Sequence, residues 1–390
     1  MNPFRPFWLQ GPGPWACIDP TAMAHNLNWL WQRLLRNGGQ ARPRLWTVLK
    51  AEAYGHGLNH ALKALGDADG VALASLEDVG RVRRQGWTGP VLLLSTTGMD
   101  PADLSDPAFG ELHFVVDDPA ALERLEQVPA PFPERHAWLR YAGHLRTHGF
   151  DDKRYADAYQ RLQALVHAGR LAGAGHFHHY AAAEDPGALA QERQAFDAVS
   201  AGLPGPRCTE NSAALCSDAP LPSFDADHWL RAGLLLYGAS ALPGRSGSEL
   251  GLRPAMSLHA RLLAIRPVAA GETVGYGDSY RAPHDTNVGV VGIGYGHGIP
   301  RDLWRRGQLL AGRDGRPVRV AGRVAMDCLT VDLGPQPPDQ PGDIMTLWGE
   351  TGAGAALPVE EVAQACDTIA AEMLTRLTAR TALVVRPKTA

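Results

Sequence analysis

Short apolar runs alternate with amphipathic segments from about Trp15 to Pro243. The strand-like runs include 15–19, 44–51, 71–75, 90–96 and 112–116, and the helical segments include 20–38, 60–70, 76–86 and 118–128. Continuous apolar runs are typical of parallel strands that helices cover on the outside. Six or more such units in about 220 residues favour a TIM-type (β/α)8 barrel over an open sheet.

The pattern changes near Ser246. Strand-like segments follow at 256–268, 287–296, 317–325, 329–333 and 343–349, with Gly, Pro and Asp between them, and helical periodicity returns only at 359–380. This pattern predicts a mostly β domain with a late helix. We therefore expect a barrel domain over 12–243 and a β domain over 250–390, joined by the Gly- and Ser-rich stretch 244–251. The first strand, near 15–19, is also able to pack with the second domain.

Composition and charge narrow the class of protein. The 390 residues are 45% hydrophobic and 20% charged, with a net charge of −4, which gives no electrostatic reason to expect nucleic acid or a membrane surface as a partner. The five cysteines (Cys17, Cys208, Cys216, Cys328 and Cys366) are widely spaced. Reduced thiols and the lack of a secretory or membrane-spanning apolar run predict a cytoplasmic protein.

The segment VLKAEAYGHG, residues 48–57, carries the sharpest chemical signal. Lys50 ends a buried apolar strand, and the carboxyl ends of barrel strands form the active-site face. Apolar surroundings disfavour an ammonium ion, and a neutral amine is what Schiff-base formation requires. The alternative for Lys50 taken alone is a solvated lysine at a strand end.

These ten residues resemble the cofactor-lysine motif of the alanine racemase family, whose usual form is VKANAYGHG, with Glu52 here in place of the Asn. Further segments are similar to the family's in the same order: 15–27, 209–215, 231–238, 252–282, 291–301 and 321–334. The resemblance implies a pyridoxal-phosphate-dependent isomerase. It implies interconversion of L- and D-alanine, and so the supply of D-alanine as a peptidoglycan precursor.

The resemblance also implies two catalytic bases. Lys50 would bind the cofactor covalently and serve as one base, and Tyr276, in VGYGDSY, matches the other. Racemisation removes a proton from one face of the α-carbon and returns it on the other, which a single side chain reaches poorly. A phenol is a poor base at neutral pH unless nearby cations lower its pKa. Without the flanking match, Tyr276 would be interpreted as an aromatic residue that packs in a turn.

Other roles follow from the resemblance position by position. Arg231 would face the pyridine nitrogen, His179 would stack on the ring, and Tyr295 and Met326 would line the substrate site. The phosphate would be bound by Tyr54, Ser212, Gly233 and Leu234. The cluster HFHH could indicate a metal site, but no carboxylate or Cys stands at ligand spacing, so we expect no metal and interpret His176 and His178 as structural.

In this family the second domain of one subunit completes the active site of the other. The resemblance therefore implies a head-to-tail homodimer with shared active sites. Tyr276 and Met326 would be supplied across its interface.

The barrel segment LRYAGHLRTHGF, residues 139–150, departs from the family's KVDTGMGRLGF. The family's Lys falls at Leu139 or Arg140 and its Asp at Ala142 or Tyr141, depending on where a gap is placed. In many members that Lys is carbamylated and positions an active-site Arg, for which Arg146 is the candidate here. Arg146 would bind the cofactor's phenolic oxygen and the substrate carboxylate. Its support would come from elsewhere, such as Arg140 or a bound anion.

Several alternatives stay open. Broad-specificity racemases also lack the carbamylated Lys, so a wider substrate range is one alternative, and a catalytically weak pyridoxal-phosphate-binding homologue is another. Metal-assisted D-amino-acid dehydratases or aldolases use a C-terminal His and Cys, whereas this chain has no histidine after His297. Pyridoxal-phosphate decarboxylases lack the GYGDSY segment. A non-catalytic carrier of the cofactor would typically be a barrel alone.

Overall fold

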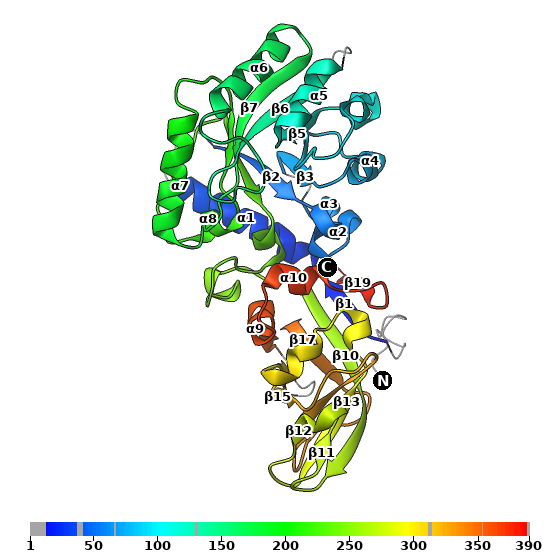
Figure 1. Cartoon of the computed structure of the whole chain (residues 1–390). Coiled ribbons are helices and arrows are strands. Elements are labelled where there is room, and N and C mark those ends of the chain that lie inside the picture. The colour runs from blue at the N-terminus through cyan, green and yellow to red at the C-terminus, as the bar shows by residue number, and fades with distance from the viewer. Residues whose placement is uncertain are drawn as a thin grey trace.

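The computed structural model describes residues 13–36, 42–65, 68–128, 132–310, 314–352 and 354–387. The predicted positions 12, 37–38, 66–67 and 388–390 lie outside these ranges. The chain forms a barrel covered by helices and a mostly β part below it (Figure 1). This architecture confirms the predicted fold class. No helix among the described residues is long and apolar enough to cross a membrane.

Eight parallel strands close the barrel. They are β2 (Arg44–Val48), β3 (Gly70–Leu73), β4 (Val91–Leu93), β5 (Leu112–Val116), β6 (Phe132–Tyr141), β7 (Leu171–His178), β8 (Arg207–Thr209) and β9 (His228–Ala232). The closure is made by β9 against β2, where Arg44 pairs with Trp229 and Thr47 with Ala232. Because all strands run in parallel, their carboxyl ends lie on one face of the barrel.

Helices connect the barrel strands, and α1 leads into the first of them. They are α1 (Pro20–Arg36), α3 (Leu58–Ala64), α4 (Leu76–Arg84), α5 (Pro119–Gln127), α6 (Tyr155–His167), α7 (Pro186–Val199) and α8 (Ser212–Cys216). Side-chain caps mark several of their starts: for example, Ser75 accepts from the amide of Asp78, Asp118 from that of Ala121, and Asp185 from that of Ala188. Such caps satisfy amides that a helix leaves without partners.

Large aromatic side chains fill the barrel interior. Trp46, Trp138 and Trp229 are buried there, and the rings of Trp46 and Trp229 stack with centroids 4.0 Å apart. Gly70 makes room for them, since a Cβ on it would lie 2.2 Å from the Trp46 ring. The interior is therefore a packed core that supports the carboxyl-end face, rather than a pore.

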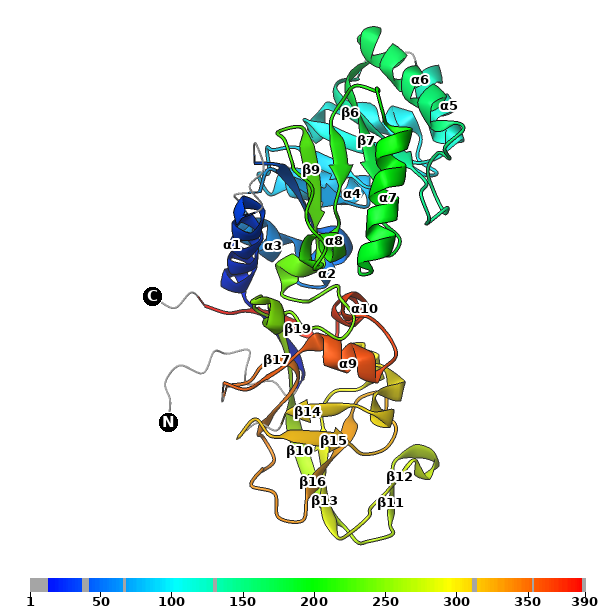
Figure 2. The ribbon, with the colours of Figure 1, turned by 90° about the vertical axis from the view of Figure 1, so that its left-hand side faces the viewer.

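The second part of the chain is a ring of six antiparallel strands. They are β10 (Met256–Val268), β13 (Thr286–Val291), β16 (Leu329–Gly334), β15 (Pro317–Val320), β14 (Gln308–Leu310) and β17 (Ile344–Glu350), with β17 pairing back to β10. A small hairpin of β11 (Thr273–Val274) and β12 (Tyr280–Arg281) extends from it, and β18 (Ala356–Leu357) pairs with β17. The hairpin lies at the end farthest from the barrel (Figures 1 and 2).

The late helical segment divides into two helices. These are α9 (Val359–Ala365) and α10 (Ala370–Thr375). The sequence pattern predicted one helical stretch over 359–380, but the chain turns at Asp367, which has a φ of 55°. A residue in the left-handed region ends a helix. The turn lets α10 fold back toward the barrel (Figure 2).

The N-terminal strand belongs to the sheet of the second domain. β1 (Trp15–Ile18) pairs antiparallel with β10 and parallel with β19 (Ala382–Val385) before the chain enters α1 of the barrel. The Asn26 side chain in α1 donates to the carbonyls of Leu236 and Arg253. The chain therefore passes between the two domains twice, from β1 into α1 and from the barrel into β10.

A left-handed turn follows β2 and contacts the second domain. The segment α2 (Lys50–Tyr54) is not a normal helix, because Ala51 to Tyr54 have φ values between 53° and 55°. Gly55 comes next, with a φ of 79°, and a Cβ on it would lie 2.2 Å from the carbonyl oxygen of Leu374 in α10. The backbone there leaves no space for a side chain.

We expect Gly55→Ala to lower the free energy of unfolding by about 2 kcal/mol or more. The change adds backbone strain to an overlap with rigid helix backbone. Urea unfolding of the variant measures the loss. Gly169→Ala is the matched control, since Gly169 has a φ of 68° and open space around it. Equal losses in the two variants would contradict a tight contact at Gly55.

Candidate active site

Lys50 lies at the carboxyl end of β2, where the left-handed turn begins. The turn is held by backbone hydrogen bonds from Ala53 to Leu49 and from Gly55 to Ala51. Burial first, and then the positive charge of Arg231, lower the pKa of Lys50. A larger share of this amine is therefore neutral and nucleophilic than in a free lysine.

His56 supports the turn from inside the protein. Its Nδ1 donates to the carbonyls of Ala53 at 3.0 Å and Tyr54 at 2.9 Å, and its ring stacks on Tyr237 with centroids 4.5 Å apart. The Tyr237 hydroxyl donates to the carbonyl of Val48 at 2.9 Å. Sequence reasoning gave no role to His56 or Tyr237, although His56 stands in the matched YGHG motif. Both residues fix the backbone around Lys50.

Glu52 has a structural role in this chain. Its carboxylate pairs with Arg81 on α4 and accepts from the amide of Leu58 at the start of α3. The ion pair with Arg81 is the main reason that the pKa of Glu52 is lowered. At the position where the family has Asn, Glu52 thus forms an ion pair with Arg81.

Arg231 and His179 lie next to each other above the barrel core. Arg231 is buried, and its Nη2 donates to the carbonyl of His178 at 2.7 Å and to Nδ1 of His179 at 3.2 Å. Its Nη1 donates to the carbonyl oxygen and the sulfur of Cys208, both at 3.1 Å. Burial, followed by the charge of Arg231, lowers the pKa of His179 to about 3. His179 is therefore neutral, and Nε of Arg231 is the donor left for a ligand.

The residues predicted to bind phosphate gather at β8, β9 and α2. A Cβ on Gly233 would lie 2.7 Å from the Tyr54 hydroxyl, so the phenol rests directly on that backbone. The amide of Gly233 donates to Oγ of Ser212 at 3.0 Å. The hydroxyl hydrogen of Ser212 and the amide of Leu234, at the first position of η4 (Leu234–Tyr237), are donors left for an anion. Burial raises the pKa of Tyr54 to about 12, which keeps its phenol protonated as a donor.

His176 and His178 are built into the protein core. Nδ1 of His176 forms a hydrogen bond with the Tyr155 hydroxyl, and the His176 ring stacks on that of Tyr159. Nε2 of His178 lies 3.2 Å from a carboxylate oxygen of Glu192. Both rings therefore have interaction partners inside the protein core.

One group of possible metal ligands occurs in the described part of the chain, consisting of Glu111, His113 and His136. The indole of Trp138 donates to Nδ1 of His113, which makes Nε2 the protonated nitrogen that donates to Glu111 at 3.0 Å. A metal ion needs the lone pair of that nitrogen. The hydrogen bonds therefore argue against a metal ion on His113.

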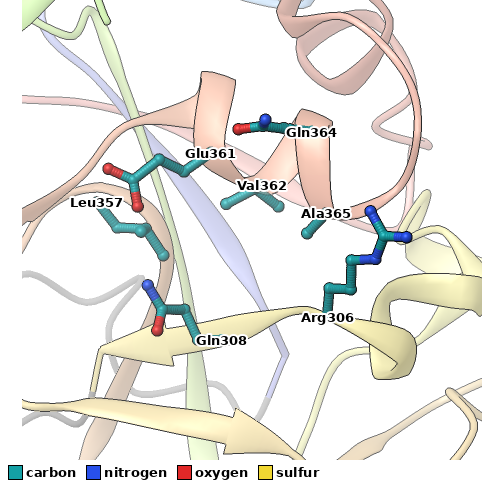
Figure 3. A pocket seen from close by; sticks show the side chains of 7 residues that line it. All are labelled: Arg306, Gln308, Leu357, Glu361, Val362, Gln364 and Ala365. Carbon is teal, nitrogen blue, oxygen red and sulfur yellow. The ribbon is translucent and has the colours of Figure 1, made fainter. Parts of the chain in front are cut away.

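A separate surface pocket lies in the second domain. It is lined by Arg306, Gln308, Leu357, Glu361, Val362, Gln364 and Ala365 (Figure 3). The pocket shares no residue with the group around Lys50.

The segment 139–150, which departs from the family's sequence, contains two arginines that lie in different places. Arg146 is exposed on a turn with a φ of 55°, and its side chain has no hydrogen-bond partner among the described residues. Arg140 lies on β6, where the pKa of its guanidinium is lowered first by burial. Leu139, the other position at which the family's Lys could fall, is fully buried.

No hydrogen bond, ion pair or ring contact among the described residues joins Tyr276, Tyr295 or Met326 to Lys50. Tyr276 sits in the β11–β12 hairpin, at the end of the second domain farthest from the barrel (Figure 1). The amides of Tyr295 and Gly296 donate to Ala325 and Met326, so these two loops are neighbours. The three side chains are 66%, 41% and 53% exposed, which is unusual for large apolar groups.

Comparisons with known proteins agree with this geometry. The model of the alanine racemase N-terminal domain matches residues 18–241, and that of the C-terminal domain matches residues 255–385. The chain belongs to the alanine racemase family. It is 38% identical to the alanine racemase of Acidovorax sp. (strain JS42), over 95% of this chain and 98% of that protein.

Solved structures of the family have the same fold. The biosynthetic alanine racemase of Pseudomonas aeruginosa superposes with a TM-score of 0.85 at 32% identity, over 97% of this chain and all of that one. The alanine racemase of Bartonella henselae, which was solved with covalently bound pyridoxal phosphate, has a TM-score of 0.80 at 22% identity, over 96% of this chain and 100% of that one. A relative with this fold therefore binds pyridoxal phosphate covalently.

Acidification should destabilise the turn through His56. Burial lowers the pKa of His56 to about 4, against 6.5 for a free ring. The stability that its neutral form gives is complete above pH 6.5 and is lost as the pH falls toward 4. Between pH 7 and pH 5 we expect His56 to account for about 2 kcal/mol of lost unfolding free energy. Urea unfolding at both pH values should show a smaller loss for His56→Gln than for the wild type. The control His167→Gln, at an exposed position, should match the wild type, and an equal loss in all three proteins would refute this role.

Proposed function

We propose that this chain is an alanine racemase that interconverts L- and D-alanine with pyridoxal phosphate, using Lys50 and Tyr276 as its two bases. The observation that carries the proposal is the position of Lys50, whose pKa is lowered, beside Arg231, His179 and the group around Gly233. Family membership supports alanine as the substrate.

The donors around Lys50 fit the cofactor at both of its polar ends. Tyr54, Ser212 and the amide of Leu234 would bind the phosphate. Gly233 has no side chain, so its backbone would let the phosphate approach closely. Nε of Arg231 would face the pyridine nitrogen, and neutral His179 would stack on the ring.

When bound, the cofactor makes the α-hydrogen of an amino acid acidic by withdrawing electrons. A guanidinium remains protonated, so Arg231 leaves the pyridine nitrogen without a proton and limits this withdrawal. Limited withdrawal disfavours side reactions such as transamination. Lys50 at Nζ and Tyr276 at Oη would each hold or release a proton on opposite faces of the α-carbon.

Tyr276 belongs to the hairpin at the far end of the second domain, so the proposed two-base scheme calls for a second chain. We infer a head-to-tail homodimer in which Tyr276 and Met326 of one subunit approach Lys50 of the other. The exposure of Tyr276, Tyr295 and Met326 supports this, since large apolar groups are commonly covered at interfaces.

Two alternatives concern the range of activity. The segment around Arg140 and Arg146 departs from the family, which keeps a broader-specificity racemase and a catalytically weak homologue as competing proposals. A panel of L-amino acids assayed for conversion to the D-enantiomer separates them. We also propose that the enzyme works in the cytoplasm, and the five cysteines are free thiols.

Replacing Lys50 tests the proposal directly. We expect Lys50→Ala to lose the visible absorption of bound pyridoxal phosphate, because no amine remains to bind it covalently. Racemisation of L-alanine should fall by at least ~10³-fold, since the same group holds the cofactor and moves the proton. Lys63→Ala, a change on α3 outside this group, should keep both properties. A retained absorption band in Lys50→Ala would exclude Lys50 as the attachment site.

Replacing Tyr276 tests the two-base scheme. In deuterium oxide the wild type should produce D-alanine that carries deuterium at the α-carbon. Tyr276→Phe should lower racemisation by about 10²-fold or more, because the hydroxyl that transfers the proton is gone. Exchange of the α-hydrogen should then be lost for one enantiomer and kept for the other, as followed by NMR. Undiminished exchange of both enantiomers would contradict the scheme.

A further inference from the structure

Arg140 faces the inside of the barrel at its carboxyl end. On β6, Trp138 belongs to the cluster that fills the barrel, whereas Leu139 and Tyr141 belong to the core outside it. Side chains of a strand alternate between its two sides, so Arg140 points to the same side as Trp138, one layer nearer to the carboxyl end. Its neighbour across the strand pair is Phe177 on β7, the ring over which Arg231 lies.

The charge of Arg140 lacks a full partner in the protein. Its Nε is buried and has no hydrogen-bond acceptor, and Arg140 joins none of the ion pairs that the described residues form. Asp117 favours its charged form, but the carboxylate oxygens of Asp117 accept from the hydroxyls of Ser95 at 2.6 Å and Thr97 at 2.9 Å. Arg140 is half-buried, and a partly buried cation without a partner is costly unless a ligand completes it.

The positive charge of Arg140 also acts on the group around Lys50. The positive charges of Arg231, Arg140 and Lys50 all act on the ring of His179. Both terminal nitrogens of Arg231 are engaged by the protein, and Lys50 is the amine that binds the cofactor in the proposed function. Arg140 therefore offers guanidinium donors at this face, beside the single Nε that Arg231 has left.

We propose that Arg140 binds an oxyanion in the active site, either the carboxylate of the amino-acid substrate or the phenolic oxygen of pyridoxal phosphate. This inference rests on the proposed function and assigns to Arg140 an anion that the resemblance assigned to Arg146. A guanidinium is suited to the task because it stays charged and presents several donors in one plane.

The test compares Arg140→Gln with the wild-type holoenzyme in two binding measurements. The first is the dissociation constant of propionate, a carboxylate without an amino group, measured by titration calorimetry. The second is the dissociation constant of pyridoxal phosphate for the apoenzyme, measured by absorbance. We expect at least one constant to rise about tenfold or more, which is typical for the loss of a charge-assisted hydrogen bond. A rise for propionate identifies the substrate carboxylate, and a rise for the cofactor identifies the phenolic oxygen.

Three further variants make the result specific. Arg140→Lys keeps the charge and should recover part of the lost binding, and it also serves if Arg140→Gln does not fold. Lys153→Gln, at an exposed position after the same strand, removes one positive charge and should change neither constant. Arg146→Gln shows whether Arg146, rather than Arg140, binds either ligand.

Two outcomes would overturn the proposal. In the first, both constants stay unchanged in Arg140→Gln while only its unfolding free energy falls, which would show that Arg140 merely balances Asp117. In the second, Arg146→Gln loses propionate binding and Arg140→Gln does not. A wild-type protein that neither binds pyridoxal phosphate nor racemises alanine would instead refute the proposed function, so the two failures are distinguishable.

Discussion

The left-handed turn from Ala51 to Tyr54 determines where Lys50 lies, and much of the molecule is arranged to hold it. Each non-glycine residue in this conformation costs roughly 1–2 kcal/mol, and four occur in succession. The compensation comes from His56 against two carbonyls of the turn and from the close approach of Gly55 to the carbonyl of Leu374. Because Leu374 belongs to α10, the second domain helps to position the lysine of the first.

In the proposed scheme, the arrangement of charge leaves one chain incomplete as a two-base catalyst. Lys50, Arg231 and Arg140 collect positive charge at the carboxyl end of the barrel, where neutral His179 lies. Tyr276 instead stands exposed on a hairpin at the far end. The positive groups at the barrel end and the phenol of Tyr276 at the hairpin end would complement each other in a head-to-tail pair.

The sequence predicted the parts of the fold that local patterns control. The alternation of apolar runs and amphipathic segments predicted the closed barrel, and the decapeptide around Lys50 led to the strand end at which that residue lies. The left-handed turn was not predictable, because local preference disfavours it at every one of its residues and only tertiary contacts hold it. The break at Asp367 was missed for a similar reason.

Arg140 shows a second limit of sequence reasoning. A gap placed one residue earlier or later moves a strand residue from the inside of a barrel to the outside, so the alignment left Leu139 and Arg140 as equal candidates. The register of β6 decides between them, with Leu139 in the outer core and Arg140 facing inward. The separation of Lys50 from Tyr276 likewise depends on how the domains are joined, which no local motif records.

The central claim is that each active site takes Lys50 from one chain and Tyr276 from another. Complementation between Lys50→Ala and Tyr276→Phe chains tests it most directly, with the two chains carrying different affinity tags and co-expressed so that mixed dimers can be purified. Each variant alone should be inactive, whereas a mixed dimer contains one intact site of two and should recover roughly half of the wild-type racemase activity. Mixed dimers that are folded, loaded with cofactor and as inactive as the parent variants would contradict the account.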